Sequence, residues 1–188
     1  MSGFLRITGG YLARRRIRVP SAADEGLVRP AQDRLREAIF SALGDAAQGA
    51  HVLDMFGGSG ALSFESISRG AQKATIIEYT RATAKNIEDN AALLGVRDKC
   101  DVLVGDALKL VGRLSQGEQF DLVFLDPPYA LFLPDAFFDA LIKVLRPNAI
   151  VVLRYEKTDK RALPSLFEVL RDRNYGSSRV LFLVKKEA

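Results

Sequence analysis

Short apolar runs alternate with segments of helical periodicity from residue 50 onward. The runs are rich in β-branched residues, which is typical of buried strands. They fall at His51–Met55, Ala74–Glu78, Asp101–Val104, Phe120–Leu125 and Ala149–Arg154. Between them, the spacing of apolar residues predicts helices at Ala61–Ser68, Arg81–Leu94, Leu108–Leu114 and Asp135–Val144. Repeated strand–helix alternation predicts an α/β fold with a mainly parallel sheet that helices cover on both faces.

The two ends of the chain depart from this alternation. Near the C-terminus, Phe167–Leu170 and Arg179–Val184 are separated by a turn rather than a helix, so we expect an antiparallel hairpin at one edge of the sheet. Near the N-terminus, Phe4–Thr8 and Arg15–Val19 flank a glycine pair and predict a second, smaller hairpin. A helix is expected from Pro30 to about Leu43.

Length and composition favour one main domain. With 188 residues, 48% of them hydrophobic, the chain is long enough for a full core. We expect a hairpin extension over residues 1–28 and the main domain over residues 29–188. No apolar run approaches the ~20 residues of a membrane helix, the first residues lack a signal-peptide pattern, and the lone Cys100 excludes an internal disulfide. These features predict a cytoplasmic protein without a membrane partner.

Positive charge is concentrated near the N-terminus. Residues 1–36 contain eight arginines, no lysine and three acidic residues, a net charge of +5, whereas the whole chain carries +4. Arginine suits phosphate contacts and stacking on bases, so this region is predicted to bind RNA. A solvated basic edge is the alternative. The candidate RNA-binding residues are Arg14, Arg15, Arg16, Arg18, Arg29, Arg34 and Arg36.

A glycine-rich turn follows the first strand of the alternating region. Asp54 ends that strand, and Gly57, Gly58 and Gly60 precede the next helix. Glycine adopts positive φ freely and has no Cβ to obstruct a ligand, and the helix N-terminus directs unpaired N–H groups to the same place. Open α/β sheets bind ligands at this kind of position. We therefore expect a nucleotide or nucleoside pocket here.

Acidic residues recur at the carboxyl ends of the predicted strands. Asp54, Glu78 and Asp126 end three of them, and Asp106 lies just past a fourth. These ends share one edge of a parallel sheet, so the carboxylates are expected to converge on one cleft and to bind a ligand. Glu78 follows Gly60 at about the distance at which an acid binds ribose hydroxyls in such folds. Taken singly, each acid has the alternative of a helix N-cap or a surface turn.

The tetrapeptide Asp126-Pro127-Pro128-Tyr129 directly follows an apolar run. Two prolines fix two φ angles and remove two N–H donors, which makes a stiff corner with carbonyls expected to be free as acceptors. Asp126 adds a carboxylate and Tyr129 a ring on which a base can stack. An exocyclic amine of a nucleobase needs such acceptors, since they favour the positive charge that develops when its nitrogen attacks.

Together, these motifs resemble a known family. The D-x-F-x-G-S-G turn, the downstream acid and D-P-P-Y resemble S-adenosylmethionine-dependent amino-methyltransferases. R-P-A-Q-D-R-L-R-E at residues 29–37, R-I-T-G-G at 6–10 and S-R-G-A at 68–71 are similar to the RsmD family, which methylates the N2 amine of one guanine in small-subunit ribosomal RNA. The resemblance implies a Rossmann-like class I methyltransferase fold with a seven-stranded sheet and a monomer that acts on naked RNA or a partly assembled particle.

The resemblance also assigns roles to single residues. It implies that S-adenosylmethionine is the cofactor, that no metal is needed, and that Asp126, Pro127 and Tyr129 hold the target guanine as the catalytic set. The implied cofactor-binding residues are Asp54, Phe56, Gly57, Gly58, Ser59 and Gly60 for the methionine part, Glu78 for the ribose, and Asp106 and Ala107 for the adenine. Two departures stand out: the family usually has Ala at the position of Gly57, and Ala31 and Gln32 replace residues that are commonly hydroxylic.

Three alternatives remain open at this point. The acceptor could be a DNA adenine or a protein glutamine, because D-P-P-Y occurs in those methyltransferases too. A dinucleotide-linked oxidoreductase is disfavoured, since the glycine turn lacks the last small residue of G-x-G-x-x-G. An RNA-binding or ribosome-assembly factor without turnover is disfavoured by the intact D-P-P-Y. Of the other residues, His51 and Cys100 are expected to be structural, and Phe132 is a candidate lid over the base.

Overall fold

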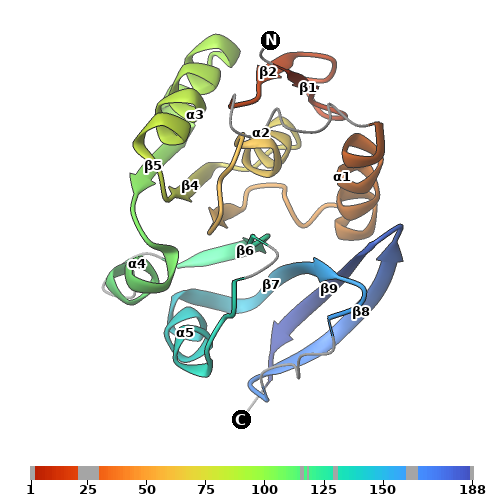
Figure 1. Cartoon of the computed structure of the whole chain (residues 1–188), viewed down its shortest axis with the longest axis vertical. Coiled ribbons are helices and arrows are strands. Elements are labelled where there is room, and N and C mark those ends of the chain that lie inside the picture. Colours follow the sequence, from red (N-terminus) through yellow and green to blue (C-terminus); the bar gives the residue numbers. More distant parts are fainter. Residues whose placement is uncertain are drawn as a thin grey trace.

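The computed structural model describes residues 3–20, 30–114, 117, 119–128, 131–159 and 165–186, without the side chains of residues 30–32. Within these ranges the chain forms a seven-stranded sheet in the order β5-β4-β3-β6-β7-β9-β8 and a separate two-stranded sheet, β1-β2 (Figure 1). No helix of the described part is both long and apolar enough to cross a membrane.

The large sheet is built from strands that mostly run in one direction. Its strands are β3 (His51–Asp54), β4 (Lys73–Glu78), β5 (Cys100–Val104), β6 (Phe120–Leu125), β7 (Leu145–Glu156), β8 (Phe167–Tyr175) and β9 (Ser178–Lys185). All neighbours from β5 to β7 pair in parallel, whereas β9 is antiparallel to both β7 and β8. The predicted α/β fold, with its mainly parallel seven-stranded sheet and its C-terminal antiparallel hairpin, is therefore confirmed.

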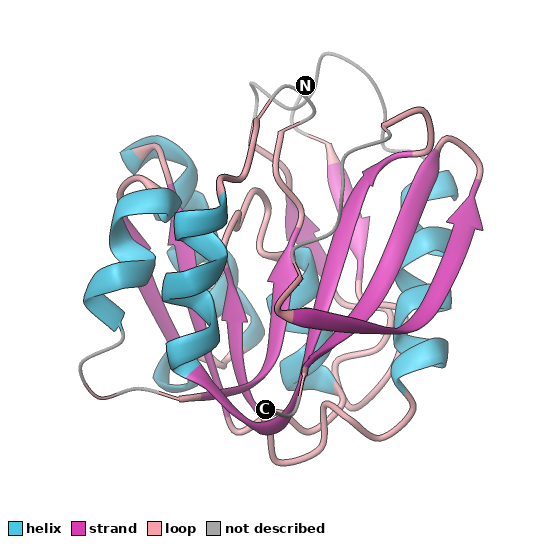
Figure 2. Cartoon of the chain, turned by 90° about the horizontal axis from the view of Figure 1, so that it is seen from below, coloured by secondary structure: helices cyan, strands magenta, loops and turns pink. Residues whose placement is uncertain are grey.

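Helices cover both faces of this sheet (Figure 2). The helices are α1 (Pro30–Leu43), α2 (Ala61–Ser68), α3 (Arg81–Leu94), α4 (Ala107–Leu114) and α5 (Asp135–Leu141), with short 3-10 turns at Arg97–Lys99 and Ile142–Val144. Buried side chains of α1, α2 and α3 form one core cluster with the sheet, and those of α4 and α5 form the other. The strands contribute alternate residues to the two clusters, since successive side chains point to opposite faces.

The N-terminal hairpin, β1 (Phe4–Arg6) and β2 (Arg16–Arg18), packs against the main domain. Leu5 and Ile17 are buried in the same core cluster as α1, α2 and α3. Asn90 of α3 accepts a hydrogen bond from the Arg18 amide at 2.8 Å and donates one to its carbonyl at 2.9 Å. Figure 1 accordingly shows the hairpin close to α2 and α3. Its buried face is fixed, while its arginines face outward.

Two strands of the C-terminal half are longer than the sequence predicts. β7 begins at Leu145 rather than Ala149, and a register shift between Phe120 and Leu122 of β6 accommodates the extra residues. β8 continues to Tyr175 through a run of charged residues, which leaves only a two-residue turn before β9. β8 is an edge strand with mostly exposed side chains, and edge strands tolerate charges that a buried strand does not.

Candidate active site

The sheet places several strand-end side chains on the face covered by α1, α2 and α3. In the parallel register, Asp54 of β3 lies opposite Phe124 of β6, which lies opposite Val152 of β7. Asp126 and Arg154 follow two positions later and therefore point to the same face. Val52, Phe124 and Val152 belong to the core cluster on this face, so the charged residues continue an apolar row beyond the carboxyl ends of the strands.

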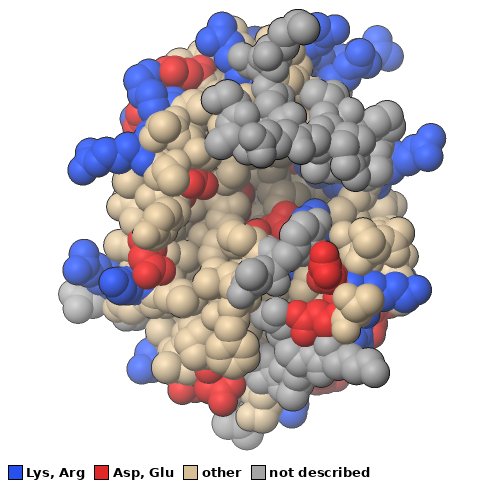
Figure 3. Space-filling model, in the orientation of Figure 1, with Lys and Arg blue, Asp and Glu red and all other residues tan. Residues whose placement is uncertain are grey.

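Two neighbouring pockets open at this edge of the sheet. We call the first the α1-side pocket; it measures about 190 Å³ and reaches from the glycine turn to Leu35, Arg36 and Ile39 of α1. The second, the α4-side pocket, measures about 550 Å³. Its lining includes Glu78, Tyr79, Gly105, Asp106, Ala107, Pro127, Pro128 and Leu131. Phe56, Gly58, Asp126 and Arg154 line both pockets. In Figure 3 a hollow with acidic atoms on its floor occupies the middle of this face.

The three glycines of the turn are needed for different reasons. Gly58 and Gly60 have φ angles of 52° and 78°, which favour glycine, and Gly60 is the N-cap of α2. Gly57 does not have a positive φ angle. Glycine is needed there for lack of space, since a Cβ would lie 2.6 Å from Cγ2 of Ile76. Its amide donates a hydrogen bond to the carbonyl of Ile77 at 2.8 Å, which holds the turn against β4.

Asp54 is buried at the end of β3, with 1% of its surface exposed. Its Oδ2 accepts a hydrogen bond from Ser63 Oγ at 2.9 Å, and its Oδ1 a longer one from the Phe56 amide at 3.4 Å. Burial raises the pKa of Asp54 from 3.8 to about 7; the two hydrogen bonds oppose this rise, and the charges of Asp126 and Glu78 add to it. A cation beside Asp54 would therefore favour its charged form.

Glu78 and Asp106 lie on the α4-side pocket. The carboxylate of Glu78 accepts hydrogen bonds from the amides of Gly58 and Thr80, both at 3.0 Å. Each of its oxygens has a second lone pair for a ligand hydroxyl. Asp106 accepts a bond from the Leu108 amide at 2.9 Å at the start of α4, so the alternative role of a helix cap applies to it as well.

The proline corner borders the glycine turn. Asp126, Pro127 and Gly58 line the same pocket, as expected from the order of the strand ends. Arg154 Nε lies 2.8 Å from Asp126 Oδ1. The expectation that the carbonyls of this corner are free is wrong in part, since the carbonyl of Pro128 accepts a hydrogen bond from the Leu131 amide at 2.8 Å. Tyr129 lies outside the described residues.

The chain is similar to proteins of one family over nearly its whole length. A family model described as "Conserved hypothetical protein 95" matches residues 5–184. Ribosomal RNA small subunit methyltransferase D of Haemophilus influenzae is 31% identical over 177 residues, 93% of this chain and 90% of that protein. The chain belongs to the ribosomal RNA small subunit methyltransferase D family.

Solved structures show that the chain has a methyltransferase fold. The Escherichia coli protein yhhF superposes with a TM-score of 0.84 at 30% identity and covers 99% of this chain and 100% of that one. The Thermus thermophilus 16S rRNA N2 G1207 methyltransferase RsmC, solved with AdoMet and guanosine, superposes with a TM-score of 0.72 at 24% identity. The superposition covers 99% of this chain and 50% of the RsmC chain. At this sequence identity, the similarity shows a shared fold.

The structure brings together most of the cofactor residues that the methyltransferase D resemblance implies. Asp54, Phe56, Gly57, Gly58 and Ser59 line the α1-side pocket. Glu78, Asp106 and Ala107 line the α4-side pocket. Gly60 lines neither pocket and instead caps α2. Whether these residues bind the cofactor stays a prediction.

The predicted RNA-binding arginines of this methyltransferase D member separate into two groups. Five are exposed: Arg14, Arg15, Arg16, Arg18 and Arg34. Arg36 is a correction: it is 5% exposed, and its guanidinium donates to Asp33 Oδ1 at 2.9 Å and to the carbonyl of Arg6. Its Nε also lies 3.4 Å from Oε2 of the buried Glu65. Arg36 therefore connects the hairpin with α1 and α2, and its guanidinium is not available to bind RNA. Arg29 lies outside the described residues.

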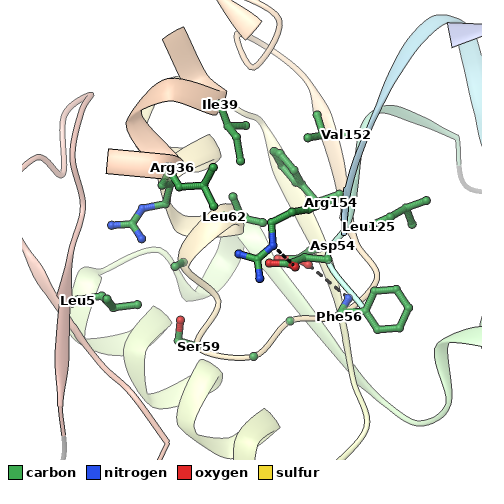
Figure 4. Close-up of a pocket in the computed structure, with 16 residues that line it drawn as sticks. Leu5, Arg36, Ile39, Asp54, Phe56, Ser59, Leu62, Leu125, Val152 and Arg154 are labelled. Carbon is green, nitrogen blue, oxygen red and sulfur yellow. Dashed lines mark hydrogen bonds and ion pairs between the residues drawn. The ribbon is translucent and has the colours of Figure 1, made fainter. Parts of the chain in front are cut away.

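Sequence reasoning missed Arg154. In Figure 4 its side chain extends into the α1-side pocket toward Asp54, whereas the guanidinium of Arg36 points away from it. Arg154 is the charged residue that ends the apolar run of β7, just as acids end the runs of β3, β4 and β6. A charged residue at the end of an apolar strand was the only sequence signal that pointed to Arg154. An arginine at this position matches none of the motifs considered above.

Proposed function

We propose that this protein transfers a methyl group from S-adenosylmethionine to the N2 amine of a guanine in small-subunit ribosomal RNA. One observation carries the proposal: the Asp126–Pro128 corner and the glycine turn border the same pocket, so an amine held at the corner lies next to a ligand held at the turn. Membership of the methyltransferase D family supports the choice of substrate.

The residues present fit the cofactor. The α4-side pocket, about 550 Å³, combines apolar walls with the Glu78 carboxylate, which suits a nucleoside with ribose hydroxyls. The glycine turn leads from it to the α1-side pocket, where the buried Asp54 suits the cationic methionine part. When bound, S-adenosylmethionine supplies a methyl group activated by its sulfonium, so the protein has mainly to align the amine with it.

In this proposal, Asp126 is the residue that activates the amine of the target guanine. The lone pair of an exocyclic amine is delocalised into the base, which makes the nitrogen a poor nucleophile. A carboxylate that accepts a hydrogen bond from one N–H group of the amine favours a pyramidal nitrogen and stabilises the positive charge that develops as the nitrogen attacks. The nitrogen loses one proton when it gains the methyl group, and the Asp126 carboxylate is placed to take that proton up. Buried Pro127 holds this carboxylate rigidly at the end of β6.

RNA binds, in this proposal, along the N-terminal hairpin and α1. Lys and Arg atoms stand along the upper edge of the face in Figure 3, where Figure 1 places the hairpin and α3. A groove of about 720 Å³ lies between the hairpin and α1. Arg6, Arg16, Arg34 and the partly exposed ring of Phe4 line it, together with Asp33 and Glu37 of α1. Arginines for phosphates beside a ring for a base are the typical elements of a single-strand RNA site.

A transfer assay tests the proposal. Protein is incubated with S-[methyl-³H]adenosylmethionine and, in parallel, naked small-subunit RNA, partly assembled small-subunit particles or duplex DNA. We expect label in one or both RNA samples and none in DNA. Asp126→Asn should abolish transfer, while calorimetry should find cofactor affinity within about twofold. The matched control is Asp121→Asn at the opposite end of β6, which should remain active. Label in DNA alone, or full activity of Asp126→Asn, would refute the proposal.

A further inference from the structure

The partner of the catalytic carboxylate is an arginine on the neighbouring strand. Leu125 of β6 and Leu153 of β7 form the last pair of residues in the register of these parallel strands. The residues that follow them, Asp126 and Arg154, are therefore also opposite each other. Arg154 Nε lies 2.8 Å from Asp126 Oδ1, and their side chains are 21% and 29% exposed. This contact is well formed and partly shielded from water, whereas most surface ion pairs are loose and solvated.

We propose that Arg154 is a positioning residue of the methyl transfer: its guanidinium holds Oδ1 of Asp126 so that Oδ2 faces the target amine. This inference rests on the proposed function. A carboxylate that is free to rotate would lose much of its benefit, because a donor–acceptor contact weakens steeply with misalignment. Arg154 lines both pockets together with Asp126, so it acts at the place where amine and cofactor are to meet.

The same contact affects the charge of Asp126. Burial raises the pKa of Asp126, and the guanidinium of Arg154 opposes this rise through its charge and its hydrogen bond. The other titratable or charged side chains that line the two pockets come from several elements: Arg36 of α1, Asp54 of β3, Glu78 of β4, Tyr79 after it, and Asp106 before α4. Burial is the cause that raises the pKa of Asp126, and it persists without the guanidinium, so loss of Arg154 should favour protonated Asp126.

A purely structural brace between β6 and β7 is the competing explanation. The same two strands carry a second ion pair at their other end, where Arg146 Nη1 lies 3.0 Å from Asp121 Oδ2. Arg146 lines neither of the two pockets described above. Arg146→Gln is therefore a matched control, since it removes an arginine–aspartate pair between these strands without touching the site.

The test compares Arg154→Gln, Arg154→Lys and Arg146→Gln. Single-turnover methyl transfer to small-subunit RNA is measured from pH 5.5 to 9 at saturating cofactor. In Arg154→Gln we expect a rate about tenfold lower at pH 6, with a gap that narrows but does not close as the pH rises, since the ionised fraction of Asp126 recovers whereas its orientation does not. Arg154→Lys should restore part of the rate at low pH, and Arg146→Gln should match wild type. A gap that closes fully at high pH would leave Arg154 with an effect on charge alone; that result, no loss in Arg154→Gln, or an equal loss in Arg146→Gln would overturn the inference.

A second measurement keeps the inference separate from the proposed function. Protein labelled with ¹³C at the Asp carboxyl carbons is titrated by NMR, and Asp126→Asn identifies the signal. Arg154→Gln should move the titration of Asp126 to higher pH, with or without any RNA substrate. An unchanged titration refutes the inference even if RNA is methylated. A changed titration in a protein that methylates no RNA refutes the proposed function and with it the positioning role.

Discussion

Asp54 should lower the stability of the protein at neutral pH. The side chain is 1% exposed, and burial raises its pKa from 3.8 to about 7. Between these values the folded state binds a proton that the unfolded state has released, so the free energy of unfolding falls as the pH rises from about 4 to about 7. A difference of about three pH units corresponds to about 4 kcal/mol.

Asp54→Asn removes this charge and keeps the shape of the side chain. Measured without added cofactor, the variant should be more stable than wild type at pH 8 by about 2–4 kcal/mol. The lower value allows for altered hydrogen bonds to Ser63 and Phe56. The difference should fall below about 1 kcal/mol at pH 4, where Asp54 is protonated in the folded state and about half protonated in the unfolded state, whose carboxyl keeps its ordinary pKa of 3.8. The same variant should bind S-adenosylmethionine more weakly, because the carboxylate that suits its positive charge is gone.

The assay is urea denaturation followed by far-UV circular dichroism at pH 4, 6 and 8, since the chain contains no tryptophan. Asp172→Asn is the control of opposite sign: a hydrogen bond from Arg179 lowers the pKa of Asp172, so that carboxylate stabilises the fold at high pH and loses its contribution as the pH falls. Equal stability of Asp54→Asn and wild type at pH 8, or a gain that does not depend on pH, would refute the reasoning.

Three further variants test other parts of the structure. Glu65→Gln should cost about 3 kcal/mol of stability in urea denaturation, because Glu65 is fully buried against Arg36, Arg69 and Thr8; a cost below about 1 kcal/mol would contradict this. Gly57→Ala should cost about 1–3 kcal/mol through its contact with Ile76, and adding Ile76→Leu should recover part of it by removing the branched methyl. Glu78→Ala should weaken S-adenosylmethionine binding in calorimetry by at least about tenfold; unchanged affinity would exclude Glu78 from the site.

The sequence predicted the elements of the fold well where local signals are strong. α2 and α3 have the predicted bounds, because glycine or a capping threonine precedes each helix and the apolar spacing is regular. The ends of β7 and β8 differ because strand pairing extends them through residues with little strand propensity. No local pattern records such pairing, since it depends on the neighbouring strand.

The candidate site was predictable where it follows from strand order. Acids at strand ends share one edge in any parallel sheet, so Asp54, Glu78 and Asp126 could be grouped from the sequence alone. Arg154 and Arg36 could not be interpreted in this way, because their roles depend on partners distant in the sequence. Arg154 meets Asp126 through the register of β6 and β7. Arg36 is buried by contact with Glu65, although its sequence context resembles that of an RNA-binding arginine.

The most direct test of the central claim is a comparison of modified nucleosides in ribosomal RNA from cells with and without this gene. Small-subunit RNA is digested and analysed by mass spectrometry. We predict that deletion lowers N2-methylguanosine by one residue per RNA, that the wild-type gene restores it, and that the Asp126→Asn gene does not. An unchanged content of N2-methylguanosine on deletion, or full restoration by Asp126→Asn, would contradict the account.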